Sequence, residues 1–267
     1  MKTTQPRLNH GFSLIEVAIV LVIISVLVSI VAIPLSTQLE QRRVEDTNKQ
    51  LETIKEALIG YALANGRFPC AAGPTDNGRE SLTTTAASGA CNQYVGFLPA
   101  VTLGLSPIDS SGFAIDAWGL PQNRIRYAVR DLNITAGSPS TCTNPVAHIL
   151  TQTDGMKSAT MGCLADVSTL VNMLTVCAVK PTGAPGAATG CTSPLTTKAP
   201  FVVLSLAKNA PAGSVGADEA HNVDTDGYFV SHTPTDINSA SGEFDDLVTW
   251  PSLNTIFARM VQAGKLP

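Results

Sequence analysis

The chain has 267 residues and a formal net charge of −4, from 17 basic and 21 acidic side chains. This balance argues against a protein that binds nucleic acid through a broad basic face. Charged residues make up only 14% of the chain. The abundance of Ser, Thr, Gly and Ala favours a secreted, loop-rich β or α+β domain over a cytosolic enzyme.

A short polar and basic leader, residues 1–11, is followed by an apolar run from Phe12 to Ile33. The run is too long for the core of an ordinary signal peptide, and no A-x-A-like cleavage site follows it. As a helix it would span about 33 Å, enough to cross the hydrocarbon core of a bilayer. Lys2 and Arg7 before the run compete with Arg42 and Arg43 after it in setting the orientation. Disulfides expected after the run place that side outside and the leader in the cytoplasm, which is consistent with the positive-inside rule. We therefore expect a single membrane-spanning helix over residues 12–34.

The same helix is predicted to continue over residues 35–65 as an amphipathic segment. Its apolar side chains recur at alternating spacings of three and four residues, which is a heptad-like pattern. They are Val44, Thr47, Leu51, Ile54, Leu58 and Tyr61. Pro34 predicts a kink, and Asn65-Gly66 followed by Pro69 predicts the end of the helix. We expect the apolar face to pack on the domain that follows.

That domain, residues 66–267, is predicted to be a globular head of the α+β class built on an antiparallel sheet. Ile125, Tyr127 and Val129 alternate with Arg124, Arg126 and Ala128, which predicts a strand with one solvated face. Further strands are expected in segments 147–153, 199–208, 227–233 and 244–252. Segment 165–179 fits either a short helix or a buried strand. Pro251-Ser252 predicts the start of a C-terminal helix.

All cysteines lie after the apolar run, and none forms a CxxC pair or a zinc-like Cys/His cluster. An even number on one side of a membrane anchor indicates disulfides in an oxidising compartment, the alternative being buried free thiols in a cytosolic domain. We favour pairing between neighbours in the sequence, with each bond stabilising the head by about 3 kcal/mol. The expected pairs are Cys70–Cys91, Cys142–Cys163 and Cys177–Cys191.

Gly11-Phe12, then Glu16, then a long apolar run that ends at Pro34, resembles the class III signal of type IV prepilins and type II secretion pseudopilins. Pro34 lies one residue later than is usual in that family. The resemblance implies cleavage between Gly11 and Phe12 by a prepilin peptidase, and N-methylation of Phe12 by the same enzyme. It also implies a type IV pilin-like fold, in which the long kinked helix packs on the sheet and disulfides staple the loops.

The resemblance further implies where the protein resides and what it contacts. The helix would anchor the chain once in the inner membrane with the head in the periplasm. An inner-membrane assembly platform would then move it into an extracellular or periplasmic filament of pilin or pseudopilin subunits. Because a carboxylate in hydrocarbon is costly and usually functional, the implied role of Glu16 is assembly. It would pair with the new amino group of Phe12 in a neighbouring subunit.

A second resemblance concerns "VLSLAKN" and "FDDLVTW", which are similar to the calcium-binding loop of the major pseudopilin. It implies calcium ligands at Leu206 (through its carbonyl), Asn209, Asp245 and Asp246. Calcium prefers six to eight oxygen ligands, so this set makes chemical sense. The alternative is a solvated acidic turn. A second acidic turn, Asp224–Gly227, lacks the rest of an EF-hand loop, and we interpret it as turn chemistry.

The sequence contains none of the common catalytic fingerprints, so we do not expect an enzyme. Two functions remain. The first is a structural filament subunit, and the size of the head favours a minor or tip position. The second is an adhesin or DNA-uptake module displayed on the filament, which would need a groove of convergent aromatic or basic residues. We expect no nucleic-acid partner, because the few arginines offer little for such a groove.

Overall fold

The computed structural model describes residues 13–83, 88–132, 147–158, 173–210 and 216–265, without the side chains of 29–36. The chain divides into two compact units, residues 1–43 and 44–267. One helix, α1 (Leu14–Asn65), contributes to both.

In the first unit, α1 begins where the Ser13 carbonyl accepts the backbone N–H groups of Glu16 and Val17. Glu16 lies in the first turn, where a negative charge interacts favourably with the helix dipole. The apolar side chains from Leu14 to Val28 are mostly exposed, and Leu14 retains 89% of its accessible surface. Among the residues whose side chains are described, no helix is both long enough and apolar enough to cross a membrane.

In the second unit, the stripe predicted from the heptad-like spacing is the buried face of α1. Thr47, Leu51, Ile54 and Leu58 are almost fully buried, and the last three belong to the main core of the head. The helix ends as expected, because Gly66 has a positive φ of 65° and donates its N–H to the Ala62 carbonyl. The prediction that this face packs on the following domain is confirmed.

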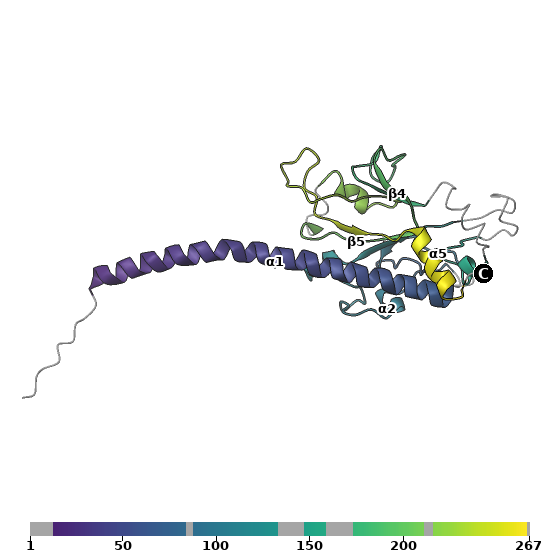
Figure 1. Ribbon diagram of the computed structural model, residues 1–267, viewed down its shortest axis with the longest axis horizontal. Coiled ribbons are helices and arrows are strands. Elements are labelled where there is room, and N and C mark those ends of the chain that lie inside the picture. Colours follow the sequence, from purple (N-terminus) through teal and green to yellow (C-terminus); the bar gives the residue numbers. More distant parts are fainter. Residues whose placement is uncertain (1–12, 84–87, 133–146, 159–172, 211–215, 266–267) are drawn as a thin grey trace, which may run out of the picture. The chain divides into compact units, whose positions relative to one another are not determined.

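The sheet under α1 is antiparallel and has the strand order β1-β2-β5-β7. Its strands are β1 (Val95–Phe97), β2 (Arg126–Val129), β5 (Phe201–Ser205) and β7 (Leu247–Thr249). One face of the sheet presents Tyr127, Val129, Phe201 and Val203 to the core that also contains α1 and α5 (Leu253–Gln262), and Figure 1 shows α5 beside the end of α1. The predicted combination of an N-terminal helix with an antiparallel sheet in an α+β domain is confirmed.

A smaller sheet covers the opposite face, with the order β4-β3-β6. It consists of β3 (Leu174–Cys177), β4 (Pro194–Ala199) and β6 (Tyr228–Val230), and β3 pairs antiparallel with β4 but parallel with β6. Val202 and Leu204 of β5 pack with Val176 and Phe229 in this second core. Strand β5 is therefore buried on both faces, which explains its continuous apolar sequence.

The remaining elements are short. They are α2 (Ala100–Leu103), η1 (Pro121–Asn123), α3 (Gly155–Ser158) and η3 (Glu219–Asn222). The C-terminal helix α5 starts at the predicted place, since the Ser252 side chain accepts the N–H of Thr255.

Two expectations about the strands were wrong. The face of β2 that carries Arg126 and Ala128 is not solvated, because the second sheet covers it and Ala128 is fully buried. Arg124 folds over the Phe113 ring, 4.3 Å from its centroid, and pairs with Asp109. Segment 147–153 forms turns rather than a strand, and the Leu150 carbonyl accepts the N–H of Phe68 near the end of α1. In both places tertiary packing overrides the local pattern.

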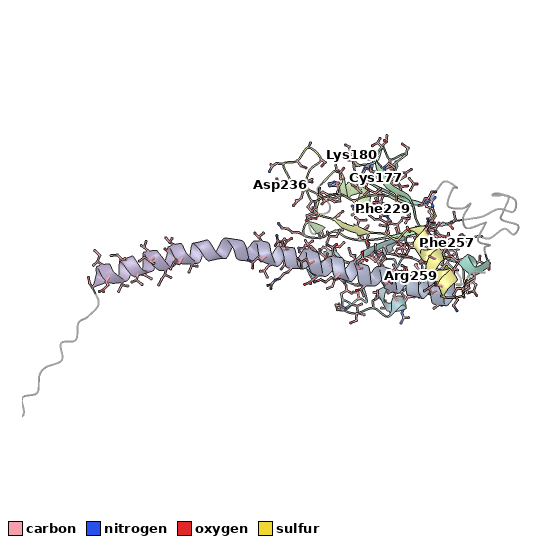
Figure 2. The ribbon with its side chains drawn as sticks, in the orientation of Figure 1. Cys177, Lys180, Phe229, Asp236, Phe257 and Arg259 are labelled. Atoms are coloured by element: carbon pink, nitrogen blue, oxygen red, sulfur yellow. A yellow bond between two sulfur atoms is a disulfide. The ribbon has the colours of Figure 1, made fainter. Side chains whose placement is uncertain are left out.

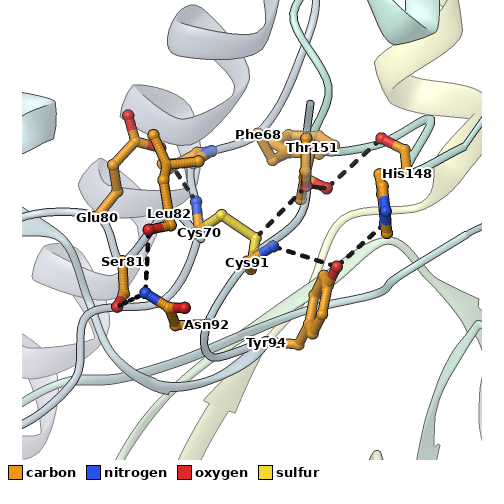
Figure 3. The surroundings of a disulfide bond; sticks show 12 residues. Phe68, Cys70, Glu80, Ser81, Leu82, Cys91, Asn92, Tyr94, His148 and Thr151 are labelled. Atoms are coloured by element: carbon orange, nitrogen blue, oxygen red, sulfur yellow. Dashed lines mark hydrogen bonds between the residues drawn. A yellow bond between two sulfur atoms is a disulfide. The ribbon is translucent and has the colours of Figure 1, made fainter. Parts of the chain in front are cut away.

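Two expected disulfides are present. Cys70–Cys91 lies beside the end of α1, where Tyr94 and His148 join the same hydrogen-bonded region (Figure 3). Cys177–Cys191 closes the loop that leaves β3. The third expected pair, Cys142–Cys163, lies outside the described residues.

Candidate functional site

The N-terminal processing residues predicted from the sequence can be placed only in part. Gly11 and Phe12 lie outside the described residues. Glu16 is exposed on the first turn of α1, among exposed apolar side chains. Pro34 lies within the span of α1, but its side chain is not described. An acid on a helix whose surroundings are apolar requires either an aqueous environment or a cation that approaches it.

A cluster of carboxylates forms the second candidate site, within the head. Glu219, Asp245 and Asp246 each direct an oxygen atom to a point where all three lie within 4.8 Å of one another. Glu219 is fully buried, and Asp246 is only 4% exposed. Three like charges this close repel strongly in a medium of low dielectric constant. The cluster therefore needs protons or a cation to be stable.

Two elements bring these acids together. Asp245 and Asp246 come just before β7 and thus sit at one end of the four-stranded sheet. Glu219 and Asn222 lie three residues apart on η3, and such residues project from the same side of a 3₁₀-helix. The Glu219 carboxylate accepts the backbone N–H of Asp245 at 2.9 Å, and the Asn222 amide donates to Asp246 at 2.8 Å. The 3₁₀ turn therefore holds both acids.

The end of β5 forms the third side of the cluster. Asn209 donates its amide to both Glu219 oxygens, at 2.8 Å each. The chain reverses direction at Ala207, where φ is +45°. Asn123 stabilises this reversal by donating a hydrogen bond to the Ala207 carbonyl. The Ser205 hydroxyl donates to Asp116 and accepts the N–H of Ala207 at 3.1 Å. This polar network beneath the turn explains why the chain reverses here.

The pKa values of these acids show the cost of the arrangement. Burial raises the pKa of Asp245 to about 7, and repulsion from Glu219 and Glu243 adds to the rise, while the N–H groups of Asn209 and Lys208 oppose it. Burial also raises the pKa of Asp246 well above its usual range. Repulsion from Glu219 and Asp245 contributes, and the Asn222 amide and the charge of Arg126 act against it.

Several oxygens in the cluster have no hydrogen-bond partner within the described part of the chain. They are Oδ1 of Asp246, Oδ1 of Asn209 and both carboxylate oxygens of Asp245, which the N–H groups of Asn209 and Lys208 approach without reaching hydrogen-bond geometry. Buried polar atoms are nearly always paired, so unpaired oxygens in a cluster of three carboxylates indicate a missing positive partner. The donor set contains only carboxylate and amide oxygens, which suits a hard cation such as calcium. The residues therefore fit the ion that the sequence resemblance implied.

The predicted ligands agree with this cluster in part. Asp245 and Asp246 are brought together, and Asn209 contacts the group. Leu206 follows β5 directly with a buried side chain, and the role of its carbonyl stays a prediction. Glu219 was missed. Its only sequence signal is the density of acids from Asp218 to Asp226, which does not reveal which of them turns inward.

Comparison with known families agrees with the pattern around Gly11. Residues 6–32 match the prokaryotic N-terminal methylation motif. This motif is the class III signal of type IV pilins and pseudopilins, and it implies processing by a prepilin peptidase and assembly with other pilin-type subunits. The methylation motif covers only the leader and the first part of α1. Comparisons with curated proteins and with solved structures find no match.

Proposed function

We propose that this chain is a structural subunit of a type IV pilus or a type II secretion pseudopilus, in a minor or tip-associated position. The methylation motif at residues 6–32 carries the proposal. After cleavage between Gly11 and Phe12, α1 anchors the subunit in the inner membrane with the head in the periplasm. Lateral packing of the helices then builds the filament.

The exposed apolar surface of α1 from Leu14 to Val28 supports this role, because such a surface requires lipid or other helices around it. Glu16 is the charged residue on this part of α1. The α-amino group created at Phe12 supplies a cation, and methylation leaves it basic. In a filament core, an ion pair between Glu16 and Phe12 of a neighbouring subunit favours one stagger, because any other stagger leaves both charges unpaired.

The minor position rests on the head. Two disulfides close loops in the head, one between Cys70 and Cys91, which lie 21 positions apart, and one between Cys177 and Cys191, which lie 14 positions apart. Together with the second sheet, these loops make a bulky head that would crowd a closely repeating surface. A subunit present in few copies, or only at a tip, avoids that crowding.

Calcium fits this function as a stabiliser of the head. Glu219, Asp245 and Asp246 would hold the ion together with the Oδ1 atom of Asn209. The ion would supply positive charge to the buried carboxylates, and those residues would then connect the end of β5, η3 and the start of β7. A filament exposed outside the cell benefits from such a link.

The alternative function, a displayed adhesin or DNA-uptake module, depends on a suitable groove. One pocket of about 480 Å³ lies between the Cys177–Cys191 loop and segment 231–241. Its lining includes Lys180, Asp218 and His232, and the rest is small or aliphatic. This lining lacks the convergent aromatic and basic residues that binding of DNA or a glycan requires. The filament subunit is therefore the better supported function.

Processing provides the direct test. The full-length chain is expressed in inner membranes with and without a prepilin peptidase, and its intact mass is measured. We expect loss of residues 1–11 and gain of one methyl group on Phe12 only when the peptidase is present. A Gly11→Val variant should stay unprocessed, whereas a Gly60→Ala variant, at an open position on α1, should be processed normally. An unchanged mass with active peptidase would exclude the proposal.

The copy number is tested on sheared filaments from the native cell. Quantitative mass spectrometry should find this chain at a small fraction of the main subunit. A dominant amount of this chain would contradict the minor role but leave the filament assignment intact.

A further inference from the structure

The acidic turn after η3 contains a second group of potential ligands, separate from the carboxylate cluster. His221 and Asp218 lie three residues apart and so share a side of η3 that differs from the side of Glu219 and Asn222. That side faces the loop closed by Cys177–Cys191, since Asp218 accepts the N–H of Lys180 at 3.1 Å. Figure 2 shows Cys177, Lys180 and Phe229 in the same region of the head, away from Phe257 and Arg259 of α5.

His221, Asp224 and Asp226 form this second group. Their ligand atoms lie within 4.8 Å of one another. The side chain of His221 is 2% exposed, and its Nδ1 atom has no hydrogen-bond partner within the described residues. An unpaired ring nitrogen at this depth is costly, because burial of a polar atom without a partner forfeits its interaction with water.

The Nδ1 atom of His221 lies close to a carboxylate and yet forms no hydrogen bond with it. It lies 3.4 Å from Oδ2 of Asp224 without forming a hydrogen bond. Two other histidines contact aspartates at shorter distances, His148 with Asp131 at 2.7 Å and His232 with Asp218 at 3.1 Å, and both pairs do form hydrogen bonds. The nitrogen and the oxygen at His221 are neighbours but not donor and acceptor.

A shared metal ion accounts for this spacing. Zinc binds histidine nitrogen and carboxylate oxygen at about 2.0–2.2 Å with tetrahedral geometry, which places two ligand atoms roughly 3.4 Å apart. The separation of 3.4 Å between Nδ1 and Oδ2 is of that size. Asp226 offers the third protein ligand, since its ligand atom lies within 4.8 Å of the other two, and water can take the fourth position.

The backbone already orients both carboxylates. Asp224 accepts the N–H groups of Gly186 at 2.8 Å and Asp226 at 3.0 Å. Asp226 accepts those of Ala188 at 2.8 Å and Tyr228 at 3.0 Å. Each carboxylate oxygen keeps a further lone pair for a metal. Such hydrogen bonds to the ligands are typical of metal sites, where they fix the orientation of the side chains that bind the ion.

The electrostatic balance also favours a cation. Burial raises the pKa of Asp224, and contact with Asp226 raises it further, although the N–H groups of Asp226 and Gly186 act in the opposite direction. A bound cation relieves the repulsion between these two acids, because it is attracted to both.

We propose that His221, Asp224 and Asp226 bind a first-row divalent cation of the zinc class. Imidazole nitrogen combined with carboxylate oxygen selects such ions over calcium, which prefers oxygen alone. The site connects η3 and the start of β6 to residues 186–188 of the disulfide-closed loop. It does not depend on filament assembly or on calcium binding at Glu219, Asp245 and Asp246.

Zinc binding to the full-length chain in detergent provides the test. The protein is stripped with a chelator, saturated with calcium and titrated with zinc by calorimetry. The wild type should bind zinc at a site that calcium does not occupy. X-ray absorption at the zinc edge should show one imidazole with oxygen ligands at about 2.0–2.2 Å.

Two matched histidine variants locate the site. His221→Gln should weaken zinc binding by at least about tenfold, whereas His232→Gln, which alters an imidazole outside the group, should leave it within about twofold. Asp226→Asn keeps the size of the side chain and should also weaken binding, which covers the case in which His221→Gln does not fold. Equal affinities of the wild type and the folded variants, or zinc bound without imidazole, would overturn the proposal.

Discussion

Arg67 forms a bidentate ion pair with Glu80, in which both hydrogen bonds are 2.7 Å long. The side chains are only 5% and 14% exposed. Arg67 also donates to the Tyr61 hydroxyl at 2.8 Å, and Glu80 accepts the N–H of Cys70 at 3.3 Å. This pair therefore connects the last turns of α1 to the loop closed by Cys70–Cys91, and Figure 3 shows Glu80 beside that disulfide.

Glu80→Gln should destabilise the protein by about 3 kcal/mol, because it leaves the Arg67 charge buried without a counter-charge. The matched control is Glu56→Gln, which breaks the pair between Glu56 of α1 and Arg259 of α5. Those side chains are 51% and 42% exposed, so we expect a loss below about 1 kcal/mol. Urea unfolding of the full-length chain in detergent measures both values. Equal losses would show that burial does not matter here.

Glu16→Ala should leave membrane insertion intact or improve it, because an uncharged helix enters lipid more easily. Filament incorporation should fall by at least about tenfold, since the Phe12 amine loses its partner. Ser25→Ala, a polar change on the same helix, serves as the control. Fractionation measures insertion, and the amount of the chain in sheared filaments measures assembly. Normal assembly of the Glu16 variant would contradict the proposed pairing.

Calcium at one hundred times its Kd should raise the free energy of unfolding by about 2.7 kcal/mol. This change corresponds to a rise in Tm of roughly 5–10 °C. Excess EDTA should reverse the rise. Asp245→Asn should abolish the calcium response. In EDTA the same variant should melt at or above the wild-type Tm, because it removes repulsion from Glu219.

Asp46→Asn is the control for the calcium experiment. Asp46 is an exposed acid on α1 with 65% of its side chain accessible, so its variant should keep the full response to calcium. A calcium response retained by Asp245→Asn would show that the ion binds elsewhere.

Acid should weaken the head partly through Asp109. Burial tends to raise the pKa of this carboxyl, but the N–H groups of Phe113 and Ser111 and the Arg124 guanidinium outweigh it and lower the pKa. The ionised form is thus favoured by folding. The ionised Asp109 carboxylate therefore contributes to the free energy of unfolding above about pH 4, and this contribution is lost as the pH falls through the lowered pKa.

Asp109→Asn should therefore lose less stability than the wild type between pH 7 and pH 3. Asp236→Asn, on an exposed turn where water screens the carboxylate, should change the pH dependence less. Urea midpoints at the two pH values give the comparison. Identical pH dependence in the wild type and Asp109→Asn would remove Asp109 from the explanation.

Replacement of Cys70 and Cys91 by serine should cost about 3 kcal/mol or more, since each bond restricts the unfolded chain. The buried position of both sulfurs adds a cost for the hydroxyl groups. Replacement of Cys177 and Cys191 should cost less, because Cys191 is only half-buried. Thermal melting of the two double variants measures the order. The reverse order would show that the second sheet depends more on its loop than the main core does.

The local features of this protein follow from short sequence patterns. Local patterns are sufficient where burial follows a regular spacing, so Leu51, Ile54 and Leu58 could be placed on the buried face of α1 from the spacing alone. The end of α1 at Gly66 and the cap at Ser252 follow from residue types that favour those backbone conformations. The pairing of Cys70 with Cys91 follows from their proximity in the chain.

The contacts between polar residues in the head depend on how distant segments of the chain pack together. Asn209, Glu219 and Asp245 approach one another because the segment after β5, the helix η3 and the segment before β7 meet at one place, and no spacing in the sequence encodes that. Arg126 belongs to a strand whose alternation predicted a solvated face, yet a second sheet from later in the chain covers it. The contacts that concentrate charge in the head are thus non-local, and they depend on how the two sheets pack.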